Sequence, residues 1–280
     1  MDTRFWGPPG WKLLHQIAYK YPEKPDEMDK LNYGIFFSNL ANILPCKYCR
    51  NSYSKYIKNL PIEKFLESRE KLTEWLYLMH NKVNGKLRRQ GFLNTPNPTL
   101  KEINERYAPC AESKCSLPGW DFIYAVVFNY STENPAPSQA NGYLTFFTYL
   151  GKVIPCEEYR KHFNNFIKKD PIEAHLTNQD SLIKWLYGIN CKINDKLNEE
   201  NSDFGKLCKF YQSFKAGSCK KKNHKGKTCR KKQFKLPTSK ENSALARDNM
   251  FLLSQKMTKK VSKSLDKTSS KTSSTTSAKK

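Results

Sequence analysis

Apolar residues recur along this chain with the period of an α-helix. The clearest stretch runs from residue 72 to residue 87, where the spacings are three and four. It places on one helix face Leu72, Trp75, Leu76, Met79, His80, Val83, Asn84 and Leu87. A second face of this kind holds Trp11, Leu14, His15, Ala18 and Tyr19, before Pro22. Strand-like alternation is weak throughout, so we predict an all-α fold built of helical bundles.

The helical pattern occurs twice. Residues 44–87 and 154–197 align without a gap at a constant offset of 110, and 17 of the 44 positions are identical. Agreement over such a length indicates a duplication, and the repeated unit has the size of a small domain. We therefore predict a first bundle over residues 1–110 and a second over residues 111–205. In the first bundle, Pro45 marks a point where a helix can begin, at Cys46.

The positive charge of the chain lies mostly at its carboxyl end. The formal charge is +23, yet residues 206–280 hold 22 basic and 3 acidic residues, which leaves 27 basic against 23 acidic residues in the body. Aromatic residues make up 13% of the chain, so wholesale disorder is excluded. We predict a basic, Lys/Ser/Thr-rich and mostly disordered tail over residues 206–280 that contacts polyanions without sequence preference.

Targeting and membrane segments are not expected. No run approaches the ~20 apolar residues that cross a bilayer, and the first ten residues lack the apolar core of a secretory signal. Nine cysteines are present, an odd number. In a chain without a signal, a Cys-x-x-Cys pair favours redox or metal chemistry over a framework of structural disulfides.

Cys46 and Cys49 form the only Cys-x-x-Cys pair in the sequence. At the N-terminus of a helix, the dipole and the unpaired N–H groups favour a thiolate. The same spacing is half of a zinc site, and the first bundle supplies only Cys110 and Cys115 as further thiols. The pair alone leaves redox chemistry and zinc binding equally open.

Polar side chains on the apolar helix faces favour a bound ligand. His80, Asn81 and Asn84 lie among the apolar positions of the helix over 72–87, with Lys86 beside them, and His15 lies on the other face. A lone histidine on an apolar face is usually a core residue. Several such groups together favour a large, flat ligand with hydrogen-bonding edges, held among Trp and Tyr side chains.

The motifs resemble those of the FAD-linked sulfhydryl oxidases of the Erv/ALR family. The resemblance covers residues 6–110 and rests on Trp11-x3-His15-x3-Tyr19, Pro45-Cys46-x2-Cys49, Trp75-Leu76-x3-His80-Asn81-x-Val83-Asn84-x2-Leu87 and Glu105-Arg106-Tyr107. The duplicated layout is most similar to versions from large cytoplasmic DNA viruses. The resemblance implies a helical bundle that holds FAD, oxidises thiols of protein substrates and passes the electrons to oxygen, giving hydrogen peroxide.

Roles for individual residues follow from the resemblance. Cys46 and Cys49 would form the redox-active disulfide, with Cys49 as the thiolate against the flavin and Cys46 exchanging with the incoming thiol. The FAD would be lined by Trp11, His15, Tyr19, His80, Asn81, Val83, Asn84 and Lys86, with Arg106 and Tyr107 near the adenine. The resemblance also implies a homodimer through the first bundles, which we expect over pairing of the two bundles within one chain.

Two departures from the family pattern concern the first bundle. No cysteine follows the helix between residues 88 and 101, so the usual structural disulfide of the family cannot form there. Cys110 and Cys115 would instead form a local staple, the simpler option, or a shuttle pair that feeds Cys46. Where the family carries a tryptophan after Glu-Arg, this chain has Tyr107, which is also aromatic.

The second bundle lacks the reactive residues. The replacements are Tyr159 for Cys49, Tyr124 for His15, Asn190 for His80 and Cys191 for Asn81. We predict a folded bundle without flavin or activity, in which Cys156 and Cys191 are buried thiols or are bonded to each other.

The tail leaves a rival function open. Cys219-x4-His224-x4-Cys229 resembles the latter part of a zinc knuckle without its Cys-x-x-Cys start, so a solvated or disulfide-bearing tail is the preferred interpretation and no metal is expected. The leading hypothesis is a thiol oxidase. The alternative is a non-enzymatic zinc- or nucleic-acid-binding module. A viral oxidase without a signal would act in the host cytoplasm and be packaged in the virion.

Overall fold

The structure is a computed structural model that describes residues 1–108, 117, 119–216 and 228–234. These residues form α-helices and two short 3₁₀ helices, and the described ranges contain no β-strand. The predicted all-α fold is confirmed. Met1–Phe234 form one compact unit. No helix within the described residues is both long and apolar enough to cross a membrane.

The first bundle consists of five α-helices and one 3₁₀ helix. In chain order they are α1 (Thr3–Tyr19), α2 (Glu27–Ile43), α3 (Lys47–Asn59), η1 (Ile62–Phe65), α4 (Arg69–Arg89) and α5 (Leu100–Tyr107). The predicted face of α4 is its buried face, with Leu72, Trp75, Leu76 and Met79 in the core. The helix begins where Ser68 caps it by accepting a hydrogen bond from the Lys71 N–H, as serine commonly does.

The second bundle repeats this order. Its helices are α6 (Trp120–Val127), α7 (Pro137–Val153), α8 (Glu157–Lys169), η3 (Ile172–His175), α9 (Gln179–Lys196) and α10 (Phe204–Ser213). Its core repeats the first one in detail. The Trp75 ring meets Phe37 edge to face at 5.3 Å and its Nε1 donates to the Leu60 carbonyl. At the matching positions, Trp185 meets Phe147 at 5.0 Å and donates to the Asp170 carbonyl.

The predicted tail does not begin at residue 206. Residue 206 lies inside α10, which packs on the second bundle as α5 packs on the first. Tyr211 of α10 stacks on Tyr124 at 4.8 Å, just as Tyr107 of α5 stacks on His15 at 4.6 Å. Of the 22 basic residues that suggested a tail, only Lys206 and Lys209 lie on α10, where both are exposed while Leu207 and Tyr211 are buried.

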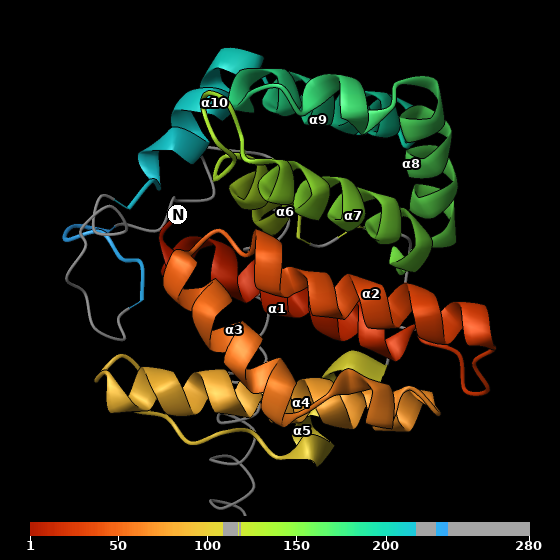
Figure 1. Cartoon of the computed structure of the whole chain (residues 1–280), viewed down its shortest axis with the longest axis vertical. Coiled ribbons are helices and arrows are strands. Elements are labelled where there is room, and N and C mark those ends of the chain that lie inside the picture. Colours follow the sequence, from red (N-terminus) through yellow and green to blue (C-terminus); the bar gives the residue numbers. More distant parts are fainter. Residues whose placement is uncertain (109–116, 118, 217–227, 235–280) are drawn as a thin grey trace, which may run out of the picture. The chain divides into compact units, whose positions relative to one another are not determined.

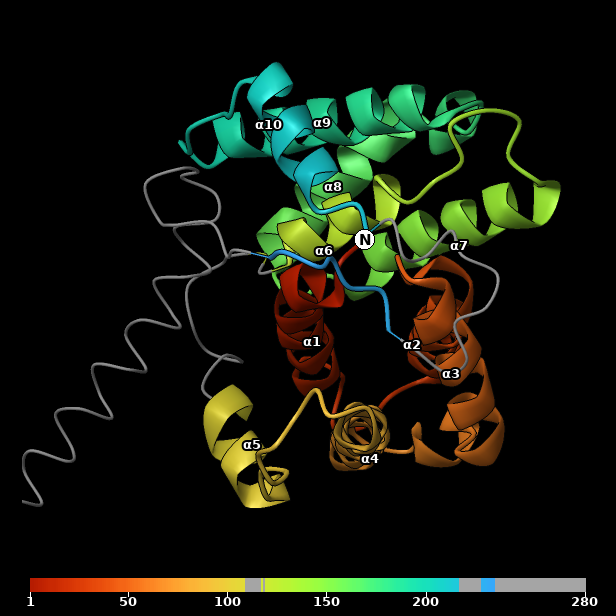
Figure 2. The same cartoon turned by 90° about the vertical axis from the view of Figure 1, so that its left-hand side faces the viewer.

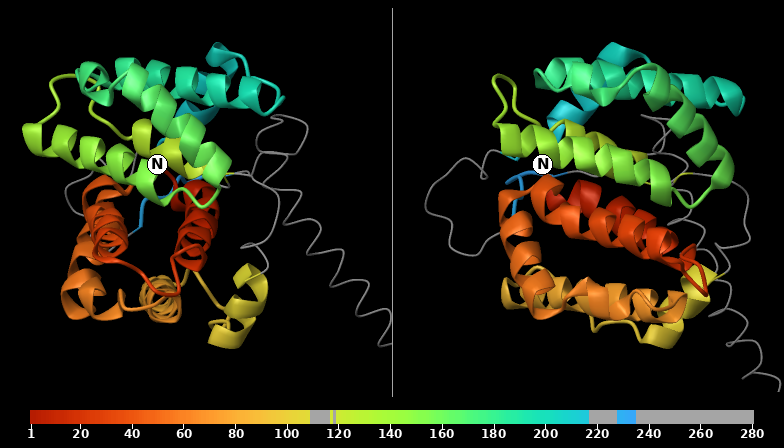
Figure 3. Two further views of the ribbon diagram at one scale, coloured as in Figure 1. Left: turned by 90° about the vertical axis from the view of Figure 1, so that its right-hand side faces the viewer. Right: turned by 45° about the vertical axis from the view of Figure 1, so that its right-hand side comes forward.

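The two bundles pack on each other through equivalent helices. The layer of α6 and α7 lies against the layer of α1 and α2, with α4 and α9 on the outside (Figures 1 and 3). Phe36 stacks on its equivalent Phe146 at 5.9 Å, and Asn39 Nδ2 donates to the Gly142 carbonyl at 2.8 Å. Pairing of the two bundles within one chain, the less expected arrangement, is therefore present. The expected homodimer stays a prediction.

One glycine permits this contact. Gly119, the N-cap of α6, has φ +113°, and a Cβ there would lie 2.8 Å from the Cβ of Leu13 in α1. Any L-residue would thus be strained in its backbone and would press α6 away from α1. Glycine is required for the close approach of the two bundles.

Candidate active site

The Cys46–Cys49 pair lies at the start of α3, as predicted. Cys46 is the N-cap residue, and its Sγ accepts a hydrogen bond from the Cys49 N–H at 3.3 Å. Both residues carry free thiols. Cys46 is buried, with 1% of its surface exposed, and Cys49 is half-buried. The helix N-terminus therefore stabilises negative charge at Cys46 in the way that the sequence predicted.

The two thiols differ in acidity. Burial opposes ionisation of Cys46, but hydrogen bonds from the Cys49 thiol and from the backbone N–H groups of Cys229 and Cys49 lower its pKa below the usual value. The hydrogen bond to Cys46 and burial raise the pKa of Cys49 well above it, and the Lys86 ammonium only partly opposes this. In the reduced pair the hydrogen bond between the two thiols favours the thiolate on Cys46, whereas the resemblance implied a thiolate on Cys49.

Lys86 connects α4 to this helix start. Its Nζ donates to the Tyr48 carbonyl at 3.3 Å and to Ser52 Oγ at 2.9 Å, both on α3. The ammonium is thereby fixed beside Cys49, within reach of its charge. Arg50 Nη1 donates to the Leu44 carbonyl at 2.6 Å and holds the segment before the helix. The cysteine pair thus lies beside the positive charge of Lys86 and of the chain's N-terminus, which favours a thiolate.

A cluster of aromatic rings forms where α1, α4 and α5 meet (Figure 2). Trp11 stacks on His80 with centroids 3.8 Å apart and an interplanar angle of 7°. His15 stacks on Tyr107 at 4.6 Å, and Tyr19 lies 5.9 Å from the same ring. The structure therefore brings together five of the residues predicted to line a flat ligand.

The two histidines of this cluster are neutral. Burial, helped by His80 and Arg106, lowers the pKa of His15 to about 3. Burial and Arg106 lower the pKa of His80 to about 4. The rings share a hydrogen bond of 3.2 Å between His15 Nε2 and His80 Nδ1, which two neutral imidazoles make by donating on one side and accepting on the other.

One buried polar atom of the cluster is unsatisfied. Within the described residues, His15 Nδ1 has no hydrogen-bond partner although the side chain is 1% exposed. A buried nitrogen of this kind costs stability unless something pairs with it. Neutral imidazoles, stacked rings and an unpaired nitrogen fit the flat, uncharged aromatic ring system of a ligand, with polar groups at its edges.

The other predicted ligand residues lie on the same elements. Asn84 Nδ2 donates to Asn97 Oδ1 at 3.2 Å, which ties α4 to the segment before α5. Arg106 lies on α5 close enough to affect both imidazoles. Asn81 and Val83 are on α4, where Val83 is half-buried despite its apolar side chain. Cys110 and Cys115 lie outside the described residues, so their pairing stays a prediction.

Sequence reasoning missed two asparagines, one in the segment before α5 and one within α5. Asn97 accepts from both Asn84 and Arg88, and Asn104 accepts from the Tyr19 hydroxyl. These amides hold α5 against α1 and α4. The available signal was the Asn97-Pro98-Thr99 sequence, because Thr99 closes a capping box with Glu102 and so fixes where α5 begins.

The second bundle keeps this geometry with other residues. Tyr124 and Asn190 replace the two histidines, and the tyrosine hydroxyl donates to the asparagine at 3.1 Å. Tyr159, in place of Cys49, is buried. The prediction of a free thiol at Cys156 is wrong, because Cys156 is disulfide-bonded. Cys191 carries a free thiol, as predicted. A bond between these two cysteines is therefore ruled out.

A metal site is not evident in the described part of the chain. No three His, Cys, Asp or Glu side chains there are grouped so that they could hold an ion. Cys219 and His224 lie outside the described residues. Cys229 is described and is disulfide-bonded.

The buried histidines make stability depend on pH. We expect the ligand-free protein to lose stability as the pH falls from 6.5 towards 4. Imidazoles titrate near 6.5 in the unfolded chain but only near 3 and 4 when folded. Between these values the unfolded state binds more protons, so acid favours unfolding, by about 1.4 kcal/mol per pH unit for each histidine.

Urea denaturation at pH 7 and pH 5 checks this dependence. The His80→Asn variant should lose less stability over that interval than the unaltered protein, since one of the titrating groups is removed. His162→Asn on α8, outside the cluster, is the control and should behave as the unaltered protein does. Equal losses in all three proteins would contradict the assignment.

Comparison with known proteins identifies the family. The sequence model of the Erv1 / Alr family matches twice, at residues 9–108 and 117–215, and so covers both bundles. A probable FAD-linked sulfhydryl oxidase of Acanthamoeba polyphaga mimivirus is 40% identical over 85 residues, which are 30% of this chain and 59% of the relative. The mitochondrial FAD-linked sulfhydryl oxidase of Saccharomyces cerevisiae is 39% identical over 92 residues, 32% of this chain and 47% of the relative.

A further viral relative matches in the same way. The FAD-linked sulfhydryl oxidase of an African swine fever virus isolate is 29% identical over 85 residues, 30% of this chain and 70% of the relative. The matches to the first two relatives span about half of their length. The double match to the family model agrees with the duplication and with the two equivalent bundles. The chain belongs to the Erv1 / Alr family.

Proposed function

We propose that this protein is an FAD-dependent thiol oxidase that forms disulfides in protein substrates. The observation that carries the proposal is that α4 joins a cluster of neutral, stacked rings to the Cys-x-x-Cys pair, because His80 belongs to the cluster and Lys86 donates to α3 beside Cys49. The relatives are named FAD-linked sulfhydryl oxidases. When bound, FAD supplies a two-electron acceptor that oxygen can reoxidise, with hydrogen peroxide as product.

The flavin site is assigned to the first bundle. Stacking would come from Trp11 and His80, and the unpaired His15 Nδ1 would meet a polar edge of the ligand. Arg106 and Tyr107 on α5 would hold the adenine end. Lys86 would keep its ammonium beside Cys49. Asn81, Val83 and Asn84 would complete the α4 side.

Thiol exchange would proceed at Cys46. A substrate thiolate attacks Cys46 Sγ of the Cys46–Cys49 disulfide, the S–S bond breaks, and Cys49 leaves with the electron pair. A second substrate thiolate attacks the substrate sulfur of the mixed disulfide and releases Cys46. The substrate thus loses two electrons and gains a disulfide. The low pKa of Cys46 makes it a good leaving group in the second step.

The second bundle serves as a partner without redox chemistry in this proposal. It covers α1 and α2 of the first bundle through α6 and α7. A homodimer through the first bundles would therefore have to use faces other than those already covered. Since two of the relatives are viral, we further propose action in a host cytoplasm and packaging in a virion.

The purified full-length protein should be yellow and carry close to one FAD per chain. One site is expected because Tyr124, Tyr159 and Asn190 replace the reactive and ligand-facing residues of the second bundle. Visible absorbance, followed by release and quantification of the flavin, measures the ratio. Two FAD per chain would contradict the assignment of the second bundle. If the purified protein were colourless and held stoichiometric zinc, the proposed oxidase function would be wrong and a zinc-binding module would be indicated instead.

A further inference from the structure

A short segment near the end of the described chain lies across the redox pair. We call this segment, residues 228–234, the strap. The backbone N–H of Cys229 donates to Cys46 Sγ, and both cysteines are buried, with exposures of 0% and 1%. The strap therefore covers the sulfur atom that a substrate thiol has to reach.

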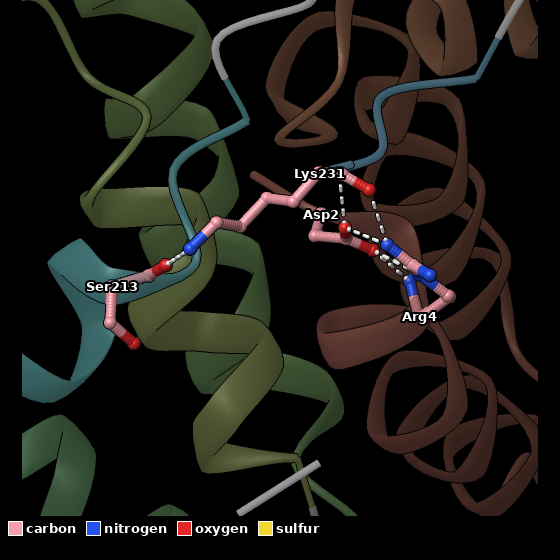
Figure 4. A network of polar contacts seen from close by, with 4 residues as sticks. All are labelled: Asp2, Arg4, Ser213 and Lys231. Carbon is pink, nitrogen blue, oxygen red and sulfur yellow. Dashed lines mark hydrogen bonds and ion pairs between the residues drawn. The ribbon is translucent and has the colours of Figure 1, made fainter. Parts of the chain in front are cut away.

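The strap is fastened to the start of α1 by a buried carboxylate. Asp2, with no exposed surface, accepts the Lys231 N–H at 2.6 Å and the Arg4 Nη2 at 2.8 Å, and Arg4 in turn donates to the Lys231 carbonyl at 2.9 Å (Figure 4). We call this group of Asp2, Arg4 and Lys231 the latch. Lys231 Nζ also donates to the Ser213 carbonyl at the end of α10.

Further contacts hold the strap along its length. The Thr3 N–H donates to the Cys229 carbonyl at 3.0 Å, and Thr228 Oγ1 donates to Gln90 Oε1 at 2.7 Å. The Arg230 guanidinium lies over the Phe92 ring at 3.8 Å. Arg4 also covers the Phe234 ring at 4.2 Å. The strap is thus joined to both ends of the site, at α1 and at the end of α4.

This closed arrangement conflicts with thiol exchange at Cys46. Attack on a disulfide requires the incoming sulfur to approach the Cys46 sulfur directly. A cysteine within a protein substrate brings its own backbone with it and cannot pass a backbone that is already hydrogen-bonded to that sulfur. The disulfide of Cys229 anchors the strap at one residue, but the rest of this short, irregular segment is held by polar contacts, and such segments open locally far more often than packed helices do.

We propose that the strap is a cover over Cys46 which has to open before a protein thiol can reach it, and that the latch sets how often it opens. The proposal rests on the proposed role of Cys46 as the exchanging cysteine. Loss of the latch should raise the accessibility of Cys46 without changing the cysteine pair. The Asp2 carboxylate is the critical group because it binds strap and α1 at once.

Alkylation of Cys46 by N-ethylmaleimide tests the cover in the reduced full-length protein. Reduction makes Cys46 a thiol and leaves only noncovalent contacts to hold the strap. The Asp2→Asn variant should react roughly tenfold faster or more, because a buried charge-assisted hydrogen bond is lost, while asparagine still caps α1. Arg4→Ala should act in the same direction. Peptide mass spectrometry reads out the modification of Cys46.

Asp26→Asn is the matched control. Asp26 is also an N-cap carboxylate, in a capping box at the start of α2, where it accepts the Asp29 N–H. In this variant, Cys46 should be alkylated at the same rate as in the unaltered protein. Circular dichroism of each variant checks that the helices remain folded. The proposal would be overturned if Cys46 were alkylated at the same rate in Asp2→Asn and Arg4→Ala as in the unaltered protein. It would also be overturned if Cys46 of the unaltered protein reacted as fast as an exposed thiol.

Activity with the Cys229→Ser variant separates the cover from a relay. If the strap is a cover, this variant should loosen it and so speed the oxidation of a reduced protein substrate. Loss of that oxidation, with oxidation of dithiothreitol retained, would instead make Cys229 an electron relay and overturn the proposal. Because alkylation needs neither flavin nor oxygen, its outcome is independent of the proposed oxidase function.

Discussion

Replacing Cys49 by serine is expected to lower oxygen consumption with dithiothreitol by at least about a thousandfold, as loss of a reactive group commonly does. Cys46→Ser should be equally inactive. Neither change should unfold α3, since serine is smaller than cysteine and is itself a good N-cap residue whose hydroxyl can accept the Cys49 N–H. Both variants should therefore retain bound FAD. Oxygen uptake and flavin content measured on the same samples separate chemistry from binding.

Cys191→Ser is the control for these two variants. Cys191 is a free thiol of the second bundle and takes the place of Asn81. Its removal should leave turnover unchanged, because no step of the proposed mechanism uses it. Near-normal oxygen consumption by Cys46→Ser or Cys49→Ser would show that this cysteine pair is not the redox centre.

His80→Ala should strip the protein of most of its FAD. The change removes the ring that stacks on Trp11 at 3.8 Å and the hydrogen bond to His15 at 3.2 Å. Contacts of these kinds contribute about 1 kcal/mol each, so we expect affinity to fall roughly tenfold to a hundredfold. Titration of the apoprotein with FAD, followed by flavin fluorescence, gives the affinity directly.

The duplication supplies a matched control for that experiment as well. Asn190 on α9 occupies the position of His80 in the second bundle and bonds to Tyr124 as His80 bonds to His15. Asn190→Ala should lower stability modestly and leave FAD affinity unchanged. If Asn190→Ala lowered the affinity as much as His80→Ala, the flavin site could not be confined to the first bundle.

The helices and the reactive pair could be predicted from the sequence because local interactions determine them. A helix needs an apolar face at spacings of three and four, a cap and a stop, and all are present within α4. The position of Cys46 at a helix N-terminus followed from Pro45 alone. The gathering of Trp11, His15, His80 and Tyr107 was implied by the resemblance to the family, and the aromatic contacts agree with it.

The tertiary structure decided the features that depend on contacts across many residues. Charge and composition suggested a solvated tail from residue 206, yet α10 packs on Tyr124 and the strap lies on Cys46. Pairing of equivalent helices α2 and α7 depends on which surfaces fit, which no local pattern encodes. The neutral state of His15 follows from burial by α4 and α5. The sequence alone thus determined the elements and their chemistry, whereas packing decided the protonation states, the pairing of the bundles and the access to Cys46.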